Sequence, residues 1–301
     1  MTSHPRTPPP KSDKQNQHYI PRWWLKAFAN ANGNIWALQG DVVRVCAAGD
    51  IMSDDWIYTL FDAWWRPSDV LEDGLSKIEG VASRLFRDIE ANGPAGDDDW
   101  SALLWFIALT ACRHPRAMKR GNELSKELGV FLHDVQKYTD AESFASAFAT
   151  CFGPQPPADM YPILSQLPQE TIEGTILHLL GLHSYDPSLP QTDALLATDD
   201  VAAAIELMDC RLLKAPVGAN FVLGDHPLPA RDLSTGFTIP LSRSLALDAK
   251  PRTGATVLRA SAVATLPEVA ASNYKQALMA HELVIGPDQA ALKLLCPIPR
   301  P

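Results

Sequence analysis

The spacing of apolar residues along the chain separates a helical middle from two strand-prone ends. In SDVLEDGLSKIEGVASRLFRDIE (residues 68–90), apolar side chains recur three and four positions apart. This spacing places them on one face of a helix. Ser68 or Asp69 is expected to cap that helix, and Asn92-Gly93 to end it.

A second stretch, WSALLWFIALTACRH (residues 100–114), is apolar on nearly every side. Such a helix is expected to be central in the fold. Asp97 or Asp98 would cap it, and Pro115 would interrupt or bend it. Further helices are expected near residues 120–138, 141–151, 160–182 and 193–207.

Short β-prone runs occupy both ends of the chain. IWALQ and VVRVC (residues 35–39 and 42–46) predict a hairpin joined at Gly40-Asp41. Later runs predict strands of one sheet, with a helix at about 267–281 between the last two. These runs are CRLLKAP, NFVLGD, GFTIPL, SLALDA and ELVIG.

This order predicts an α+β fold, with a small, mostly antiparallel sheet and a large helical middle section. Residues 1–16 are rich in Pro, Ser and Lys and predict a disordered tail. Residues 17–301 would form a single domain with a helical insertion at about 66–208. We expect the early hairpin to join the late sheet, which would bring residue 18 near residue 225.

Composition and charge restrict the classes of function. Apolar residues make up 46% of the chain and no apolar run spans a bilayer, so we expect a protein without a membrane partner. The start of the chain lacks the apolar segment of a secretory signal, which predicts a cytoplasmic protein. The net charge is −9, but residues 1–30 carry five Lys or Arg and one Asp, or +4, and residues 31–301 carry −13. An acidic body disfavours broad binding to nucleic acid, whereas a local basic groove remains compatible with it.

Several motifs, taken in order, resemble one family. They are QHYIPRWWLKAFA, VLEDGLSKIE, RHP at Arg113, FVLGDHPL, IPLSRSLAL and a late Asn273. Together they resemble the bacterial domain of unknown function 4238, with a QHYVPxFYLRxF-type opening and an SDxP-type segment. The resemblance covers roughly residues 15–285. This chain departs from the pattern at Gly224, where Ser is usual, and at Arg243, where Pro is common.

Asp225 is the first candidate for catalysis. The segment FVLGDHPLP places it where an apolar strand ends in a Gly-Asp-His-Pro turn. A carboxylate in that position either presents an acid or base to a cleft or accepts backbone N–H groups of the turn.

The opening motif supplies a second group of candidates. His18 could carry a proton or bind a phosphate, or it could fix the N-terminal segment through hydrogen bonds. Tyr19, Trp23 and Trp24 could stack on a planar ligand. Because adjacent helical residues point about 100° apart, one of the two tryptophans is expected to face the core.

Charged residues of the middle section complete the candidate site. Glu72 and Glu79 lie one heptad apart on one helix face, directed either inward as acids, bases or metal ligands or outward into solvent. Arg113 would pair with a carboxylate or a phosphate. Asn273 would orient a substrate amide or cap a helix. The predicted catalytic residues are therefore Asp225, His18 and Glu79, and the predicted substrate-binding residues are Tyr19, Arg22, Trp23, Trp24, Arg113, His226 and Asn273.

These residues predict a hydrolase that acts on nucleic acid, foremost a DNA-base N-glycosylase without a metal or other cofactor. An extruded base would stack on the aromatic side chains, and Asp225 would stabilise positive charge on the sugar. The kind of family suggests a role in bacterial anti-phage defence. Two alternatives stay open: a metal-dependent nuclease built on Asp225, Glu72 and Glu79, and a noncatalytic binding or toxin-related module.

Overall fold

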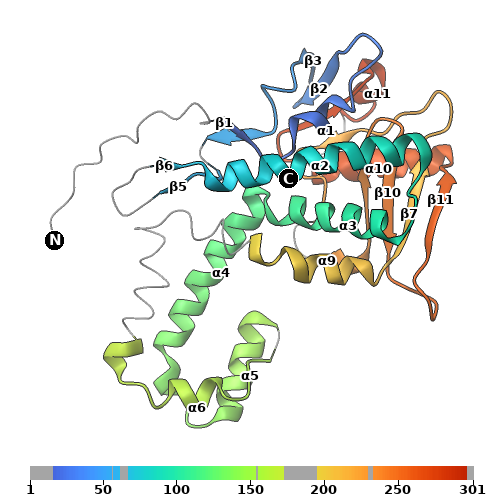
Figure 1. Cartoon of the computed structure of the whole chain (residues 1–301). Coiled ribbons are helices and arrows are strands. Elements are labelled where there is room, and N and C mark those ends of the chain that lie inside the picture. The colour runs from blue at the N-terminus through green and yellow to red at the C-terminus, as the bar shows by residue number, and fades with distance from the viewer. Residues whose placement is uncertain are drawn as a thin grey trace.

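The computed structural model describes residues 16–55, 57–61, 67–153, 155–172, 195–229 and 233–296, without the side chains of 60–61, 67 and 118–126. Most of the predicted tail and residues 173–182 of a predicted helix lie outside these ranges. Two four-stranded sheets and a helical section form an α+β fold, as predicted (Figure 1).

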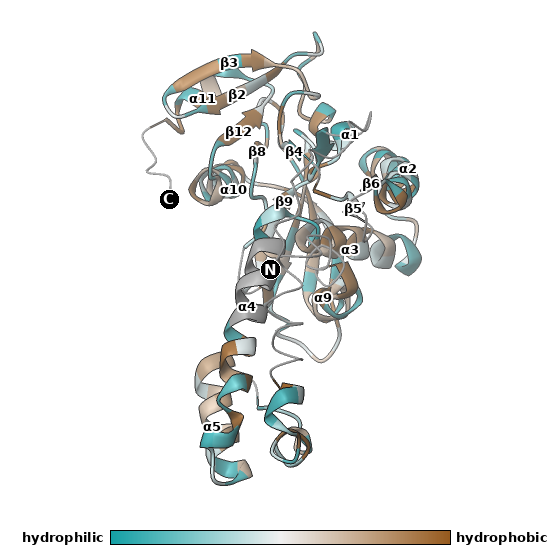
Figure 2. Cartoon of the chain, turned by 90° about the vertical axis from the view of Figure 1, so that its left-hand side faces the viewer, coloured by the Kyte–Doolittle hydropathy of each residue, from teal (hydrophilic) through white to brown (hydrophobic). Residues whose placement is uncertain are grey.

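The first sheet joins the two ends of the chain. Its strands, in spatial order, are β3 (Val42–Cys46), β2 (Ile35–Gln39), β12 (Leu283–Gly286) and β8 (Leu223–Gly224), all antiparallel. The predicted hairpin is therefore confirmed, as is its pairing with a C-terminal strand. Strand β3 lies at the edge and exposes Val42 and Val45, in agreement with its hydrophobic colour in Figure 2.

The second sheet contains C-terminal strands only. Its order is β11 (Arg259–Val263), β7 (Asp209–Lys214), β10 (Leu245–Lys250) and β9 (Phe237–Pro240). Only β11 and β7 run parallel in this sheet. The prediction that all C-terminal strands belong to one sheet is therefore wrong.

Helix α10 (Leu266–Met279) explains this division. The Gln276 side chain accepts from the Gly224 N–H at 3.0 Å, and it donates to the carbonyls of Pro227 at 3.0 Å and Thr238 at 3.2 Å. An amide side chain thus satisfies backbone groups of β8, of the turn after it and of β9. The two segments need not pair with each other, because buried backbone groups require a partner but not a particular one.

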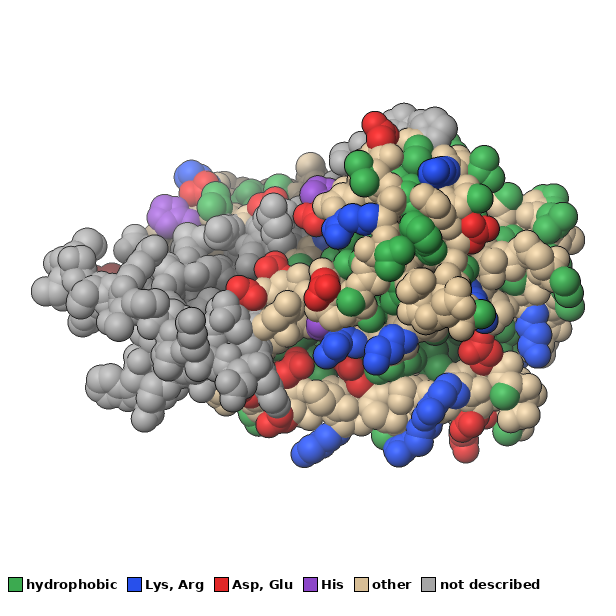
Figure 3. Space-filling view, turned by 90° about the horizontal axis from the view of Figure 1, so that it is seen from above, with side chains coloured by type: hydrophobic (Ala, Val, Ile, Leu, Met, Phe, Trp, Pro, Cys, Tyr) green, Lys and Arg blue, Asp and Glu red, His purple; other side chains and the backbone are tan. Residues whose placement is uncertain are grey.

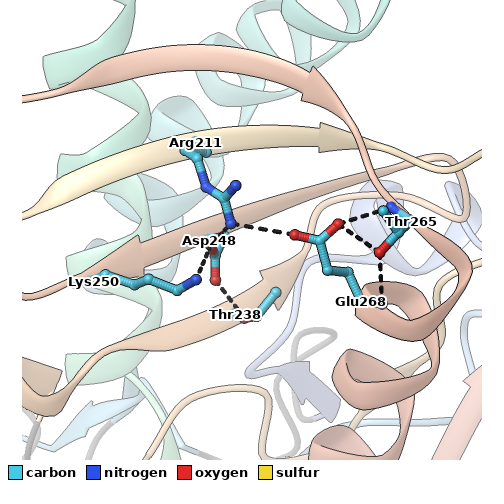
Figure 4. A network of polar contacts seen from close by, with 6 residues as sticks. All are labelled: Arg211, Thr238, Asp248, Lys250, Thr265 and Glu268. Atoms are coloured by element: carbon cyan, nitrogen blue, oxygen red, sulfur yellow. Dashed lines mark hydrogen bonds and ion pairs between the residues drawn. The ribbon is translucent and has the colours of Figure 1, made fainter.

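A polar network holds α10 against the second sheet (Figure 4). Asp248 on β10 accepts from Arg211 at 2.7 Å and from Thr238 at 2.9 Å. Arg211 also lies 3.5 Å from Glu268. Glu268 and Thr265 form a capping box at the start of α10, which satisfies N–H groups that the helix itself leaves free.

The helical section lies between β6 and β7 in the chain. Its long helices are α2 (Val70–Asn92), α3 (Asp97–Cys112) and α4 (Pro115–His133). The predicted central helix is confirmed, since Leu103, Leu104 and Ile107 of α3 are fully buried. Pro115 interrupts the apolar stretch and begins a new helix instead of bending α3. The N–H groups of a first helical turn have no partner within the helix, so proline, which lacks an N–H, fits this position.

Helix α4 leads to a lobe that projects from the sheets (Figures 1 and 2). The lobe contains η1 (Val135–Lys137), α5 (Ala141–Phe152) and α6 (Met160–Leu164), and α9 (Thr198–Glu206) returns the chain to α3. The remaining elements are short: β1 (Asn16–His18), α1 (Arg22–Lys26), β4 (Ser53–Asp55), β5 (Leu60–Phe61), β6 (Pro67–Ser68), η2 (Leu233–Thr235) and α11 (Gln289–Lys293). Strand β1 pairs with β4, which the sequence did not predict.

Candidate active site

Hydrogen bonds fix the opening motif before it enters α1. The Gln17 amide donates to Thr59 Oγ1 at 2.9 Å and accepts from the Tyr58 N–H at 2.5 Å. His18 Nε2 lies 3.1 Å from the carbonyl oxygen of Ala48, so its ring ties the motif to the loop after β3. Burial lowers the pKa of His18, and the Ala48 carbonyl opposes that effect in part. Its geometry matches the structural role considered above, in which His18 holds the N-terminal segment.

Arg113 binds the backbone of the same motif. Its side chain is 1% exposed and donates to the carbonyls of His18 at 2.7 Å and Tyr19 at 3.2 Å. A third bond, 2.7 Å long, joins it to Glu79 Oε1 on α2. The guanidinium also lies 5.3 Å from the ring centre of Tyr58. The predicted pairing of Arg113 with a carboxylate is confirmed, and Glu79 is that carboxylate.

His114 connects the next position of the chain to the Gly-Asp-His-Pro turn. Its Nδ1 accepts from the Arg116 N–H at 3.2 Å, so its Nε2 carries the proton and donates to the Asp225 carbonyl at 2.8 Å. Burial, followed by the nearby His226, lowers the pKa of His114 to about 4. Adjacent side chains at the break between α3 and α4 thus hold residues 18 and 225 in one region, as the sequence predicted.

Both oxygens of the Asp225 carboxylate accept hydrogen bonds. Oδ1 accepts from the His281 N–H at 2.8 Å, and Oδ2 accepts from the N–H groups of Glu282 at 2.7 Å and Leu283 at 3.2 Å. Burial raises the pKa of Asp225, but the bonds from His226 and from these N–H groups outweigh burial and lower it overall. Asp225 is therefore a fixed anion that links β8 to the start of β12.

His226 is oriented by that anion. Its Nδ1 lies 3.2 Å from Asp225 Oδ1. An ionised carboxylate only accepts, so Nδ1 must donate, and the neutral ring then has an unprotonated Nε2. The side chain is 16% exposed, and within the described ranges Asp225 is its one hydrogen-bond partner. Asp225 and His226 form a dyad of the kind that prepares a histidine to accept a proton.

Three more aromatic rings surround the dyad. The ring centres of His114 and His226 are 4.3 Å apart, and those of His226 and His281 are 5.9 Å apart. Tyr19 packs edge-on against His114 at 4.8 Å. Burial, then the charges of Asp225 and Glu282, raise the pKa of Tyr19, so its hydroxyl stays protonated at neutral pH.

The two adjacent tryptophans have different environments, as expected from helix geometry. Trp24 is fully buried, and its Nε1 donates to the Pro240 carbonyl at 3.3 Å. It therefore lies in the core, although it was predicted to bind substrate. Trp23 is partly buried and lines a pocket of about 210 Å³ between α1, α2 and the turn after β9.

The remaining predicted residues are carried by α1, α2 and α10. Asn273 accepts from the Val222 N–H at 3.0 Å and donates to the Asn220 carbonyl at 2.9 Å, so it joins α10 to the segment before β8 and does not cap a helix. Arg22 is exposed on α1, next to Gly49. Glu72 is partly buried on α2. Burial is the main cause of the raised pKa of Tyr58, and the charge of Glu72 raises it further.

The three carboxylates of the metal-dependent alternative are not brought together as free ligands. Backbone N–H groups occupy both oxygens of Asp225, and Arg113 engages Glu79. Within the described part of the chain, no group of three His, Cys, Asp or Glu residues has the arrangement of a metal site.

Comparison with known families shows which family the chain belongs to. A family model matches residues 16–289, which is nearly the whole chain. The chain belongs to the family "Protein of unknown function (DUF4238)". Neither the search of curated proteins nor that of solved structures gave a match to this DUF4238 protein.

Three residues that hold Asp225 in this DUF4238 protein were not predicted: His114, through its side chain, and His281 and Glu282, through their backbone N–H groups. His114 stood in the RHP motif, but only Arg113 was considered. His281 and Glu282 lie where a helix ends and a strand begins. Antiparallel pairing of β8 with β12 places them beside Asp225, and this pairing was the signal that could have identified them.

Among the helices described, none combines the length and the hydropathy needed to cross a bilayer.

Proposed function

We propose that this DUF4238 protein is a hydrolase in which His226 activates a water molecule and Asp225 orients His226. The observation that carries the proposal is the 3.2 Å contact between His226 Nδ1 and Asp225 Oδ1. It leaves Nε2 as the proton-accepting atom of a partly exposed imidazole. A positioned general base of this kind contributes typically 10²–10⁴-fold to a rate.

The surroundings favour this assignment over direct chemistry by Asp225. Three backbone N–H groups and His226 already occupy the carboxylate, so Asp225 would act through the imidazole. His114 stays neutral down to about pH 4 and adds no competing positive charge beside His226. Tyr19 keeps its proton and could donate a hydrogen bond to substrate.

The substrate that we propose is the N-glycosidic bond of a nucleotide within nucleic acid, foremost DNA. Cleavage of that bond develops positive charge on the sugar. The water activated by His226 would add its oxygen to that sugar carbon as the bond to the base breaks, and the departing base would take up the proton that His226 accepts. Phosphate contacts would come from local cations rather than from the acidic body. Exposed Lys and Arg side chains of α1 and α2 supply such cations: Arg22, Lys26, Lys77, Arg84 and Arg87. We place the activity in bacterial anti-phage defence, so phage DNA is the substrate of choice.

The test uses the full chain and phage DNA, modified and unmodified, with and without EDTA. We expect free base and abasic sites in the presence of EDTA. The variant His226→Gln should lower the rate about 100-fold or more while its unfolding midpoint stays close to that of the wild type.

His281→Gln is the matched control, since His281 is an exposed histidine next to the dyad, and it should retain most activity. Strand breaks that require metal would support the nuclease instead. Unchanged nucleic acid in every reaction would favour a noncatalytic binding module. Full activity of His226→Gln would show that the dyad is not the catalytic group.

A further inference from the structure

The pocket beside Trp23 has an aromatic side, an acidic side and a basic rim. It lies between α1, α2 and the turn that joins β9 to β10, and its volume is about 210 Å³. Pockets that enclose drug-sized ligands are larger, about 300–1,000 Å³, so this one suits a single planar ring system. Its lining includes Trp23, Ser83, Phe86, Arg87, Glu90 and Ser242.

The aromatic side consists of Trp23 with Phe86. The Trp23 ring is parallel to Trp24 within 16° and lies edge-on to Phe86 at 5.1 Å. Trp23 Nε1 is buried and has no hydrogen-bond partner in the described chain, whereas Trp24 Nε1 has one. A buried unpaired N–H costs about 1–3 kcal/mol. Phenylalanine would fill the core without that cost, so packing alone does not account for a tryptophan that also presents ring surface to a pocket.

Glu90 forms the acidic side. Its Oε1 accepts hydrogen bonds from the hydroxyls of Ser242 and Ser244, each 2.5 Å long. These two bonds fix the carboxylate on one oxygen, and within the described residues Oε2 accepts none. An ionised carboxylate has no proton to donate, so a ligand that meets Oε2 must be a donor.

One cation, Arg87, lines the rim. Its side chain is exposed, and one of its N–H groups binds the Ser83 carbonyl at 3.1 Å; the other four have no partner among the described residues and remain for a ligand. Arg22, Lys26 and Arg84 are exposed on the same two helices. Seen from above, several Lys and Arg side chains lie along one edge of the molecule, with Asp and Glu side chains among them (Figure 3). A phosphate attached to the bound ring would meet the positive charge of Arg87.

We propose that this pocket binds one nucleobase that carries an exocyclic amine, as cytosine does. The ring stacks on Trp23, the amine donates to Glu90, and the sugar and phosphate extend toward Arg87. Stacking of a base on an aromatic side chain contributes about 1–3 kcal/mol. This site is additional to the dyad, because neither Asp225 nor His226 lines the pocket, and base binding requires no hydrolysis.

Calorimetric titration of the full chain with cytidine and uridine tests the proposal. The two nucleosides differ at position 4 of the ring, which carries an amine in cytidine and a carbonyl in uridine, and at N3, which carries a proton only in uridine. Cytidine should bind about tenfold more tightly, since the uridine carbonyl would face the carboxylate. Glu90→Gln keeps an oxygen for the two serines and places an amide N–H₂ toward the ligand. The preference for cytidine should disappear in that variant.

Asp88→Asn, an exposed carboxylate two positions away on α2, is the matched control and should keep the preference. The His226→Gln variant should also keep it, so that failure of the catalytic proposal and failure of this one are distinguishable. Equal affinities for the two nucleosides, a preference that survives Glu90→Gln, or no heat with either nucleoside at millimolar concentration would overturn the assignment.

Discussion

The guanidinium of Arg113 donates to the main-chain carbonyl of His18 over 2.7 Å, across 95 positions of the sequence. The next side chain, His114, makes the corresponding contact with the Asp225 carbonyl. Two neighbouring residues therefore join the opening motif to the FVLGDHPL segment. Stability and the geometry of the dyad depend on the same short segment.

Removing the charge of Glu79 should destabilise the fold. Glu79→Gln leaves the buried guanidinium of Arg113 without its anion. Breaking a fully buried pair costs about 3–5 kcal/mol, but Glu79 is 21% exposed, so we expect about 2 kcal/mol. Urea unfolding measures this difference, and Asp88→Asn on the same helix should change little. A Glu79→Gln variant as stable as the wild type would contradict the role assigned to the pair.

Arg113→Lys should also destabilise, although the charge is kept. A lysine ammonium cannot reproduce the planar fork that serves Glu79 and two carbonyls at once. We expect a lowered melting temperature, followed by circular dichroism, and a further loss in the double variant with Glu79→Gln that is smaller than the sum of the single effects. Strict additivity would show that the two side chains act independently.

Acid should weaken the fold through His114. Its pKa is about 4 in the folded chain against an ordinary value of 6.5, so between these values the unfolded chain holds a proton that the folded chain lacks. The free energy of unfolding is therefore unaffected by this histidine above about pH 6.5. It decreases as the pH falls toward 4, by an amount on the order of 3 kcal/mol. His114→Gln retains a donor for the Asp225 carbonyl and cannot titrate. Unfolding free energies at pH 7 and pH 5 should therefore differ less in this variant than in the wild type.

Asp225→Asn should destabilise strongly. The new amide group must direct an N–H₂ toward either the His281 N–H or the N–H groups of Glu282 and Leu283. A buried donor without an acceptor costs about 1–3 kcal/mol, so we expect a loss of about 3 kcal/mol in urea unfolding. His226→Gln, in contrast, should lose activity with little loss of stability. Equal stability of Asp225→Asn and the wild type would contradict the structural part of this assignment.

Gly224→Ser should be unfavourable in this chain, although serine is usual at this position in the motif that the sequence resembles. A Cβ at Gly224 would lie 2.7 Å from the Gln276 carbonyl and 3.3 Å from the Ala280 side chain. Overpacking of this kind costs about 1–3 kcal/mol. Gly80→Ala is the matched control, because no atom lies within 4 Å of its Cβ position and alanine favours helices. A serine variant that melts at the wild-type temperature would show that α10 can move aside.

Local patterns predicted much of the fold. Apolar spacing predicted α2, and Asn92-Gly93 predicted where it ends. The Gly40-Asp41 turn between two β-prone runs predicted the hairpin. The division into two sheets could not be predicted, because it depends on the Gln276 side chain meeting three distant backbone groups. Polar side chains inside helices have no spacing rule that reveals which backbone they satisfy.

The candidate site was only partly predictable for a related reason. Residue types identified Asp225 and His226, but the number of N–H groups on a carboxylate depends on tertiary contacts. The assignment of Asp225 as a direct catalyst therefore stays a prediction, whereas the contact that orients His226 is a feature of the structure. His114 was missed because its importance lies in a bond to residue 225, 111 positions away.

Helix α4 connects the projecting lobe to the Gly-Asp-His-Pro turn. His114 is the N-cap of α4, and the same ring holds the Asp225 carbonyl, while the far end of α4 carries the lobe of α5 and α6. A single covalently continuous helix thus runs from that distant lobe to the turn that positions the imidazole of His226. Any displacement of the lobe that tilts α4 must either stretch the contact at residue 225 or shift the dyad with it, which makes this helix a direct mechanical path between the periphery and the proposed catalytic group.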